Sequence, residues 1–184
     1  ALANNSVAYK GKPEMGTFMR EWVSLYESKS GERGIFNREA AKVQAAKNGR
    51  RDWGQRFGCN PCSEIILRPY QFCNLSEVVA RASDTQQTLR EKVRLATILG
   101  TFQSTLTDFK YLRKIWQKNT EEERLLGVSL TGIMDNDLLS GTSAHLGKNI
   151  GQTLESLRDT AVETNASMAE QLGIPQSTAI TCVK

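Results

Sequence analysis

The chain of 184 residues has no continuous apolar run of about 18 residues, the length needed to span a membrane. It also lacks a basic segment followed by an apolar stretch, so no secretion signal is visible. Its net charge of +4 comes from lysines and arginines spread along the chain rather than gathered in a basic stripe, which argues against direct nucleic-acid binding. We therefore expect a cytoplasmic globular protein without membrane or nucleic-acid partners, with a mild charge bias that suits an anionic ligand such as a nucleotide.

Cysteine occurs at only four positions, too few for a disulfide-stabilised scaffold in a chain of this length without an export signal. Cys182, in an apolar strand-like segment, is expected to be a buried hydrophobic residue. Cys59 and Cys62 form a C-x-x-C pair, which alone would suit half a zinc site or a thioredoxin-like dithiol. Cys73 and the single histidine, His145, do not complete a recognised zinc-ligand spacing, and the pair precedes a strand-like run instead of following one. We therefore predict no metal site, with a zinc-binding or simple thiol domain kept as an alternative.

The hydrophobic pattern predicts short strands that alternate with long helices, which is typical of an α/β fold. Helices are predicted over 14–28, 38–48, from Asp84 to about 106, 109–124 and 148–172. Short strands or extended segments are predicted over about 1–10, 64–67, 75–79, 125–133 and 177–184. Asn37 and Asp84 are the predicted N-caps, and Gly173 is the predicted C-terminal cap of the last long helix. Loops are expected over 28–34 and 48–58.

Three of the four cysteines lie in residues 58–78, GCNPCSEIILRPYQFCNLSEV. Asn60, Cys62 and Glu64 alternate there, and in an extended segment alternate side chains point the same way. The sulfur could then perform a one-electron or nucleophilic step, the carboxylate could accept a proton from a substrate hydroxyl, and the amide could hold that hydroxyl. Cys73 could return across the intervening strand to lie near Cys62.

The motif NPCSEI followed by CNL resembles the active-site finger loop of ribonucleotide reductases, with its N-x-C-x-E pattern. The short separation of Cys62 from Cys73 resembles the adenosylcobalamin-dependent class. The segments SGERGIFNREAA, LLGVSLTGIMD and STAITCVK resemble further parts of the family, the last being the strand that leads into its substrate-phosphate loop. The resemblance implies that residues 1–184 are an internal fragment of one catalytic domain, the central part of a ten-stranded α/β barrel made of two half-barrels, with 58–78 as the finger loop.

By the same resemblance, Cys62 would carry the thiyl radical that abstracts the ribose 3′-hydrogen. Glu64 would be the general base on the 3′-hydroxyl, and Asn60 would hydrogen-bond a ribose hydroxyl. Cys73 would be one of the two thiols that reduce the substrate and end as a disulfide. Ser6 is a further candidate substrate contact, because the family has an NNS segment there, although a plain turn would suit the same residues.

The activity implied is the reduction of ribonucleoside di- or triphosphates to deoxyribonucleotides, with adenosylcobalamin as cofactor and a thioredoxin-like protein or a dithiol as reductant. The alternatives are the large subunit of an iron-dependent reductase and a non-catalytic thiol or zinc-binding α/β domain. Cys59 stands where the family usually has threonine or another small residue, and Arg33 where it usually has proline. The fragment alone is expected to be inactive, because the first redox cysteine, the phosphate loop and the cofactor surface would lie outside it.

Overall fold

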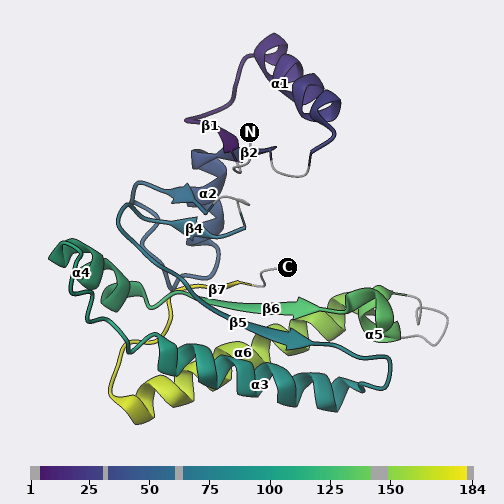
Figure 1. Cartoon of the computed structure of the whole chain (residues 1–184), viewed down its shortest axis with the longest axis vertical. Coiled ribbons are helices and arrows are strands. Elements are labelled where there is room, and N and C mark those ends of the chain that lie inside the picture. The colour runs from purple at the N-terminus through teal and green to yellow at the C-terminus, as the bar shows by residue number, and fades with distance from the viewer. Residues whose placement is uncertain (1–4, 31–32, 61–63, 142–148, 182–184) are drawn as a thin grey trace. The chain divides into compact units, whose positions relative to one another are not determined.

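The computed structural model describes residues 5–30, 33–60, 64–141 and 149–181 (Figure 1). Contacts divide the chain into two compact units, Ala1–Gln71 and Phe72–Lys184. Among the described residues, no helix combines the length and the apolar character that crossing a bilayer would require. Each unit has its own parallel strand pairing, so the two are described in turn.

The first unit opens with a β-α-β arrangement. Strand β1 (Asn5–Tyr9) pairs in parallel with β2 (Arg33–Asn37), and helix α1 (Met15–Ser28) makes the crossover. The predicted helix over 14–28 is thus confirmed, whereas the end of the predicted loop 28–34 belongs to β2. Asn37 is confirmed as the N-cap of α2 (Arg38–Ala46), because its Oδ1 accepts the backbone N–H groups of Glu39 and Ala40.

After α2 the chain forms a small antiparallel hairpin. Strand β3 (Gly58–Cys59) pairs with β4 (Ile66–Leu67), so that Gly58 lies opposite Leu67 and Cys59 opposite Ile66. Cys59 and Ile66 of the hairpin pack against a small buried cluster, which consists of Phe36, Ala41, Ala45 and Phe57. The hairpin is therefore anchored to α2 through apolar contacts, and its loop carries the residues of the predicted site.

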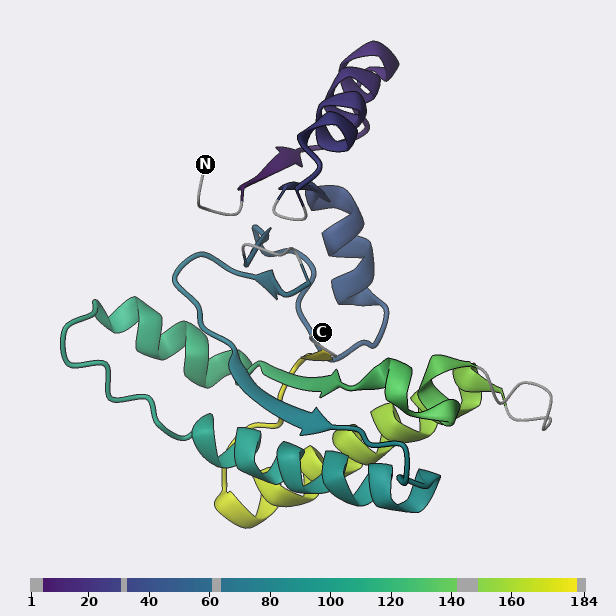
Figure 2. The same ribbon diagram turned by 45° about the vertical axis from the view of Figure 1, so that its right-hand side comes forward.

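The second unit is a three-stranded parallel sheet with helices on one face. Strands β5 (Asn74–Val79), β6 (Leu126–Thr131) and β7 (Ile180–Thr181) pair in that order. Helices α3 (Gln86–Gln103) and α6 (Ile150–Leu172) lie along one face of this sheet and against each other (Figures 1 and 2). Their shared core contains Val78, Ala80, Leu89, Val93, Ala96, Val128, Leu130, Leu139, Leu157 and Ala161.

These parallel strands, joined by helices, confirm the predicted α/β organisation; the ten-stranded barrel and the single domain over 1–184 stay predictions. Gly173 is confirmed as the C-terminal cap of α6, with a left-handed φ of +65°. Of the predicted strand over 177–184, only Ile180–Thr181 forms a strand, β7; residues 177–179 are not in a strand, and Cys182 lies outside the described residues.

Two predicted helix starts were wrong. Helix α3 is capped by Thr85, whose hydroxyl accepts the Thr88 N–H, while Asp84 braces the preceding turn by accepting the Arg81 N–H. Helix α4 (Lys114–Glu123) begins five residues later than the predicted 109. Phe109 instead lies in the connection before it, where its ring meets that of Phe72 edge-on at 5.2 Å between centroids. Local propensity is overridden here by a tertiary aromatic contact.

The turns that follow β5 and β6 touch each other beyond the ends of the strands. After β6 come a short 3₁₀ turn, Ile133–Asp135, and helix α5 (Asp137–Ser140). Asn136, 1% exposed, donates from Nδ2 to the carbonyls of Arg81 and Asp84, and so ties the two turns together. Gly132, with φ of +72°, brings the backbone so close that an added Cβ would lie 2.3 Å from the Ala80 carbonyl oxygen.

We expect Gly132→Ala to destabilise the protein by more than the roughly 1 kcal/mol that left-handed strain alone costs, because the methyl group would also collide with rigid backbone. Gly141→Ala is the matched control: Gly141 has φ of +79° but nothing within 4 Å of an added Cβ. Urea denaturation of the two variants measures the difference. Equal destabilisation would contradict the close approach at Gly132.

A second prediction concerns Asp84, whose side chain is 8% exposed and contacts the Lys92 ammonium. The hydrogen bond from Lys92, with those from the Arg81 N–H and the Thr88 hydroxyl, holds the pKa of Asp84 below its usual 3.8 despite burial. Because the folded-state pKa is lowered, this stabilisation is present above about pH 4 and is lost as the pH falls through the folded-state pKa.

Asp84→Asn should therefore lower the free energy of unfolding at pH 7 by about 1.5–3 kcal/mol and flatten its dependence on pH below 4. Asp159→Asn, which breaks an exposed pair with Arg158, should leave both nearly unchanged. Chemical denaturation between pH 2.5 and 7 provides the measurement. A wild-type acid profile as flat as that of Asp84→Asn would show that the Asp84 contacts do not stabilise the fold.

Candidate active site

The loop of the hairpin in the first unit is closed by two hydrogen bonds between the same pair of residues. The Asn60 N–H donates to the Ile65 carbonyl at 3.2 Å, and the Ile65 N–H donates to Asn60 Oδ1 at 2.9 Å. Together with the pairing of Cys59 and Ile66, these bonds mean that the chain reverses direction between residues 60 and 65. The predicted extended segment from Asn60 to Glu64 runs through residues 61–63, which lie outside the described residues, so the convergence of the Asn60, Cys62 and Glu64 side chains stays a prediction.

The Asn60 side chain uses its oxygen, Oδ1, to close this loop. Because Oδ1 accepts the Ile65 N–H, the orientation of the amide is fixed by hydrogen bonding, and Nδ2 is the end left to donate to a ligand. An amide NH₂ held in this way suits a hydroxyl or carbonyl oxygen. The residue is thus both a structural closure of the loop and a candidate donor to a substrate.

Glu64 lies on the same loop and carries the strongest local sign of a binding site. Its carboxylate oxygen Oε2 is buried and has no hydrogen-bond partner among the residues that the structure describes. Buried polar atoms are nearly always hydrogen-bonded, since leaving one unpaired costs about 1–3 kcal/mol or more for a charged group. A carboxylate oxygen accepts only, so the complementary ligand group is a donor such as a hydroxyl.

Of the other predicted site residues, Cys62 lies outside the described residues, as does His145. Ser6 lies within β1, opposite Gly34 of β2, so the plain turn considered for it was wrong. The structure therefore brings Asn60 and Glu64 onto one loop, and it places Ser6 on a strand of the same unit.

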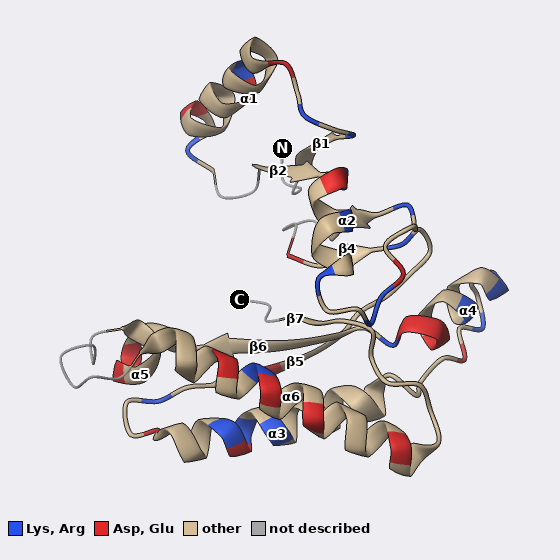
Figure 3. Cartoon of the chain, turned by 180° about the vertical axis from the view of Figure 1, so that it is seen from behind, with Lys and Arg blue, Asp and Glu red and all other residues tan. Residues whose placement is uncertain are grey.

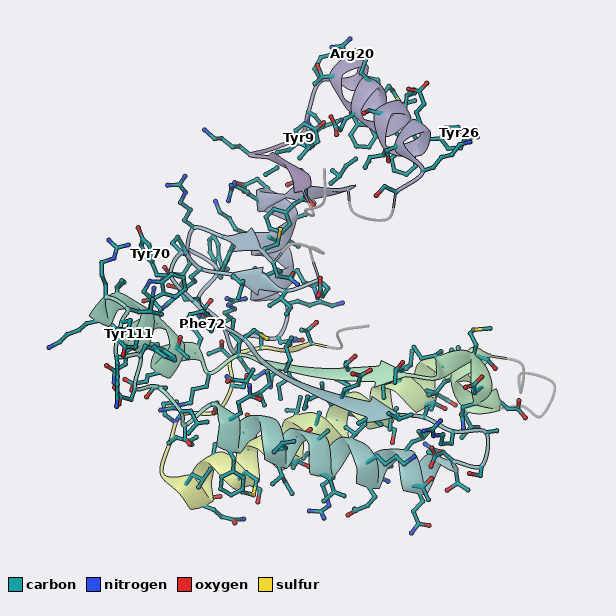
Figure 4. All side chains as sticks on the ribbon, in the orientation of Figure 1. Tyr9, Arg20, Tyr26, Tyr70, Phe72 and Tyr111 are labelled. Atoms are coloured by element: carbon teal, nitrogen blue, oxygen red, sulfur yellow. The ribbon has the colours of Figure 1, made fainter. Side chains whose placement is uncertain are left out.

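Cys73 lies in the second unit, half-buried and directly before β5. On one side of it, Phe72, labelled in Figure 4, stacks on Trp116 at 4.7 Å between ring centroids. On the other side, the buried Asn74 donates from Nδ2 to the Leu125 carbonyl at 3.2 Å, beside the β5–β6 pairing. The backbone around this thiol is therefore fixed on both sides, as a group that must meet a reaction partner in one geometry requires.

Two residues that hold the hairpin were missed by the sequence analysis. Arg51, in the stretch taken as an irregular polar loop, is only 6% exposed, and Gln71 is 5% exposed. Both hydrogen-bond within the hairpin region. A charged side chain in a polar loop gives no sequence signal of burial, because the same composition is typical of solvent-exposed connections.

Within the part of the chain that the structure describes, no three His, Cys, Asp or Glu side chains gather closely enough to hold a metal ion. A recess of about 550 Å³ lies on α4, lined by Lys114, Gln117, Lys118, Glu121, Glu122, Arg124 and Pro175. Its wall carries side chains of both signs, and Figure 3 shows basic residues toward one end of α4 and acidic residues toward the other. Because both signs of charge line it, the recess does not select a ligand by charge.

Comparison with known proteins points to one class of enzyme. The chain is 32% identical over 152 residues to an adenosylcobalamin-dependent ribonucleoside-triphosphate reductase of Lactobacillus acidophilus, covering 69% of this chain and 20% of that protein. It is 27% identical over 187 residues to a protein of the same name from Lacticaseibacillus paracasei, covering 88% of this chain and 24% of that protein. No family model and no solved structure matches the chain.

The resemblance predicted from NPCSEI and CNL is therefore confirmed: by sequence, the chain is related to the ribonucleotide reductases. Within them, both of these relatives carry the name of the adenosylcobalamin-dependent class. The chain spans about a fifth to a quarter of the length of these relatives.

Proposed function

We propose that this chain forms part of an adenosylcobalamin-dependent reductase that converts ribonucleotides to deoxyribonucleotides by a thiyl-radical mechanism. The names of the two relatives support the reaction, the triphosphate form of the substrate and the cofactor. The observation that carries the proposal is the buried, unpartnered Oε2 of Glu64, on a loop closed by the neighbouring Asn60. A ribose ring would supply the hydroxyl donors that this acceptor lacks.

In the proposed site each residue has one task. Cys62 holds the thiyl radical and abstracts the ribose 3′-hydrogen, and Glu64 accepts the proton of the 3′-hydroxyl. Asn60 donates from Nδ2 to a ribose hydroxyl and so fixes the sugar relative to both groups. Cys73 is one of two thiols that supply the reducing electrons and end as a disulfide, which a thioredoxin-like protein or a dithiol then reduces. Ser6 is proposed as a further contact to the substrate.

The proposed setting is the interior of a ten-stranded α/β barrel, of which β5, β6 and β7 would form part. The alternation along β5 supports this: Asn74, Ser76 and Val78 are buried, while the intervening Leu75, Glu77 and Val79 are exposed. Parallel sheets are almost always covered on both faces, and α3 and α6 cover one. A barrel would close the other face and keep solvent away from a radical site.

When bound, adenosylcobalamin supplies a radical by breaking its cobalt–carbon bond. The recess on α4 does not fit this cofactor, because five of its seven lining residues are charged, whereas a corrin ring needs an extended apolar surface. We therefore assign none of the described residues to holding it, and the proposal for this chain concerns the substrate and the thiols.

Cys62→Ser should abolish turnover while leaving nucleotide binding intact, because serine keeps the shape of the site but cannot carry a thiyl radical. In the complete polypeptide that carries this chain, deoxynucleotide formation should fall by at least about 10³-fold, with nucleotide affinity changed by less than about threefold. Cys59→Ser is the matched control and should retain activity. Near-normal turnover in Cys62→Ser, or one zinc ion bound per chain through Cys59 and Cys62, would contradict the proposal.

Cys73→Ser tests the reducing step separately from the radical step. Without an added small-molecule thiol, we expect at most one deoxynucleotide per active site, because the disulfide that the natural reductant would reduce cannot form and the pair of reducing thiols cannot be restored. Rapid-quench measurement of product per enzyme, with the thioredoxin-like protein as the sole reductant, gives the stoichiometry. Sustained multiple turnover under these conditions would remove Cys73 from the reaction.

A further inference from the structure

Arg51 joins both strands of the hairpin from a buried position. Its guanidinium carbon lies 4.7 Å from the ring centroid of Phe57, the residue before β3. Its Nη1 donates to the carbonyl of Ile66, in β4, at 2.8 Å. One planar group thus contacts the incoming strand through a cation–π interaction and the outgoing strand through a hydrogen bond.

Gln71 completes this arrangement. Its Oε1 accepts from Arg51 Nη2 at 3.3 Å and from the Arg68 N–H at 2.8 Å. The chain that leaves β4 is thereby folded back onto the same guanidinium. On the opposite side, Arg38 of α2 donates from Nη1 to the Phe57 carbonyl, which ties the incoming strand to the helix. The base of the hairpin is therefore fixed by side chains on both strands, while its loop is closed by Asn60.

From these contacts we propose that Arg51 is a positioning residue, which sets the orientation of the hairpin and hence the places of Asn60 and Glu64. This inference rests on the proposed function for its link to the reaction. The hairpin has only two residues in each strand, so its own ladder is too short to hold it in one orientation. The guanidinium supplies the missing constraint, because its donors point in fixed directions within one plane.

The choice of arginine supports a role in geometry. Burying a cation is costly, and a well-packed apolar side chain commonly stabilises such a site as much or more. A lysine could reach one acceptor but could not address Ile66 and Gln71 in a shared plane while lying flat on Phe57. Arg51→Lys therefore keeps the charge and removes the planar fork, which isolates the feature on which the inference depends.

The first test measures the hairpin itself in this chain by amide hydrogen exchange. In Arg51→Lys, the N–H groups of Asn60 and Ile65 should exchange about tenfold faster than in the wild type, while those of α2 stay unchanged. Arg56→Lys, an exposed arginine of the same loop, is the matched control and should change neither. Unchanged exchange at Asn60 and Ile65, or faster exchange throughout α2 as well, would overturn the proposal.

The second test measures the consequence for catalysis in the complete polypeptide. Arg51→Lys should lower kcat by about 100-fold, as expected for a misplacement near 1 Å, with KM changed by less than about threefold. Gln71→Ala should lower kcat in the same direction, and the double variant should be little worse than Arg51→Lys, because the two side chains share one interaction. Normal kcat in Arg51→Lys despite faster hairpin exchange would overturn the positioning role.

The two tests separate this inference from the proposed function. If the wild-type polypeptide formed no deoxynucleotide, the proposed function would fail, while the exchange comparison would still decide whether Arg51 orients the hairpin. If the wild type were active and Arg51→Lys differed from Arg56→Lys in neither exchange nor kcat, only the role of Arg51 would be lost.

Discussion

The candidate site depends on the pair of hydrogen bonds by which Asn60 and Ile65 close the hairpin loop. Without them, the four intervening residues would be a flexible connection, and the ordering entropy of several side chains would oppose any fixed geometry. With them, the Asn60 amide has a defined orientation, and the buried Glu64 carboxylate oxygen lies where no group of the described residues donates to it. These two hydrogen bonds thus determine which groups the loop offers to a ligand: a donor at Asn60 Nδ2 and an acceptor at Glu64 Oε2.

The second unit also fixes the backbone beside its candidate reactive group, but through contacts at the ends of its strands. At the ends of its parallel strands, Gly132 lets the turn after β6 pass against the Ala80 carbonyl, and the buried Asn136 bonds to the turn after β5. These contacts fix strand ends, where ligands of open α/β sheets usually bind. At the start of β5, Asn74 and Phe72 fix the backbone on either side of Cys73. Both units therefore place their candidate reactive groups beside tightly constrained backbone.

The sequence predicted the parts of the fold that follow from periodicity and capping. The helices α1, α2 and α6, the Asn37 cap and the Gly173 cap all depend on contacts within a few residues, which a local pattern encodes. It failed where distant residues decide: Phe109 contacts Phe72 instead of starting a helix, and Arg51 is buried although its neighbours are polar. The motif around Asn60 and Glu64 was recognised, but the antiparallel pairing of β3 with β4 on either side of it was not, because that pairing joins residues several positions apart.

The small size of the hairpin explains why its base and its loop are held by different contacts. A ladder of two residue pairs cannot be rigid by itself, and a longer, stiffer one would fill space that a substrate needs. Constraints on the hairpin must therefore come from outside its ladder, and they come at the base, from Arg51, Gln71 and Arg38. The contacts that hold the hairpin therefore lie at its base, while Asn60 joins the two sides of its loop through both its N–H and its Oδ1. The polar stretch between α2 and β3 is then part of the site's scaffold and more than a connection.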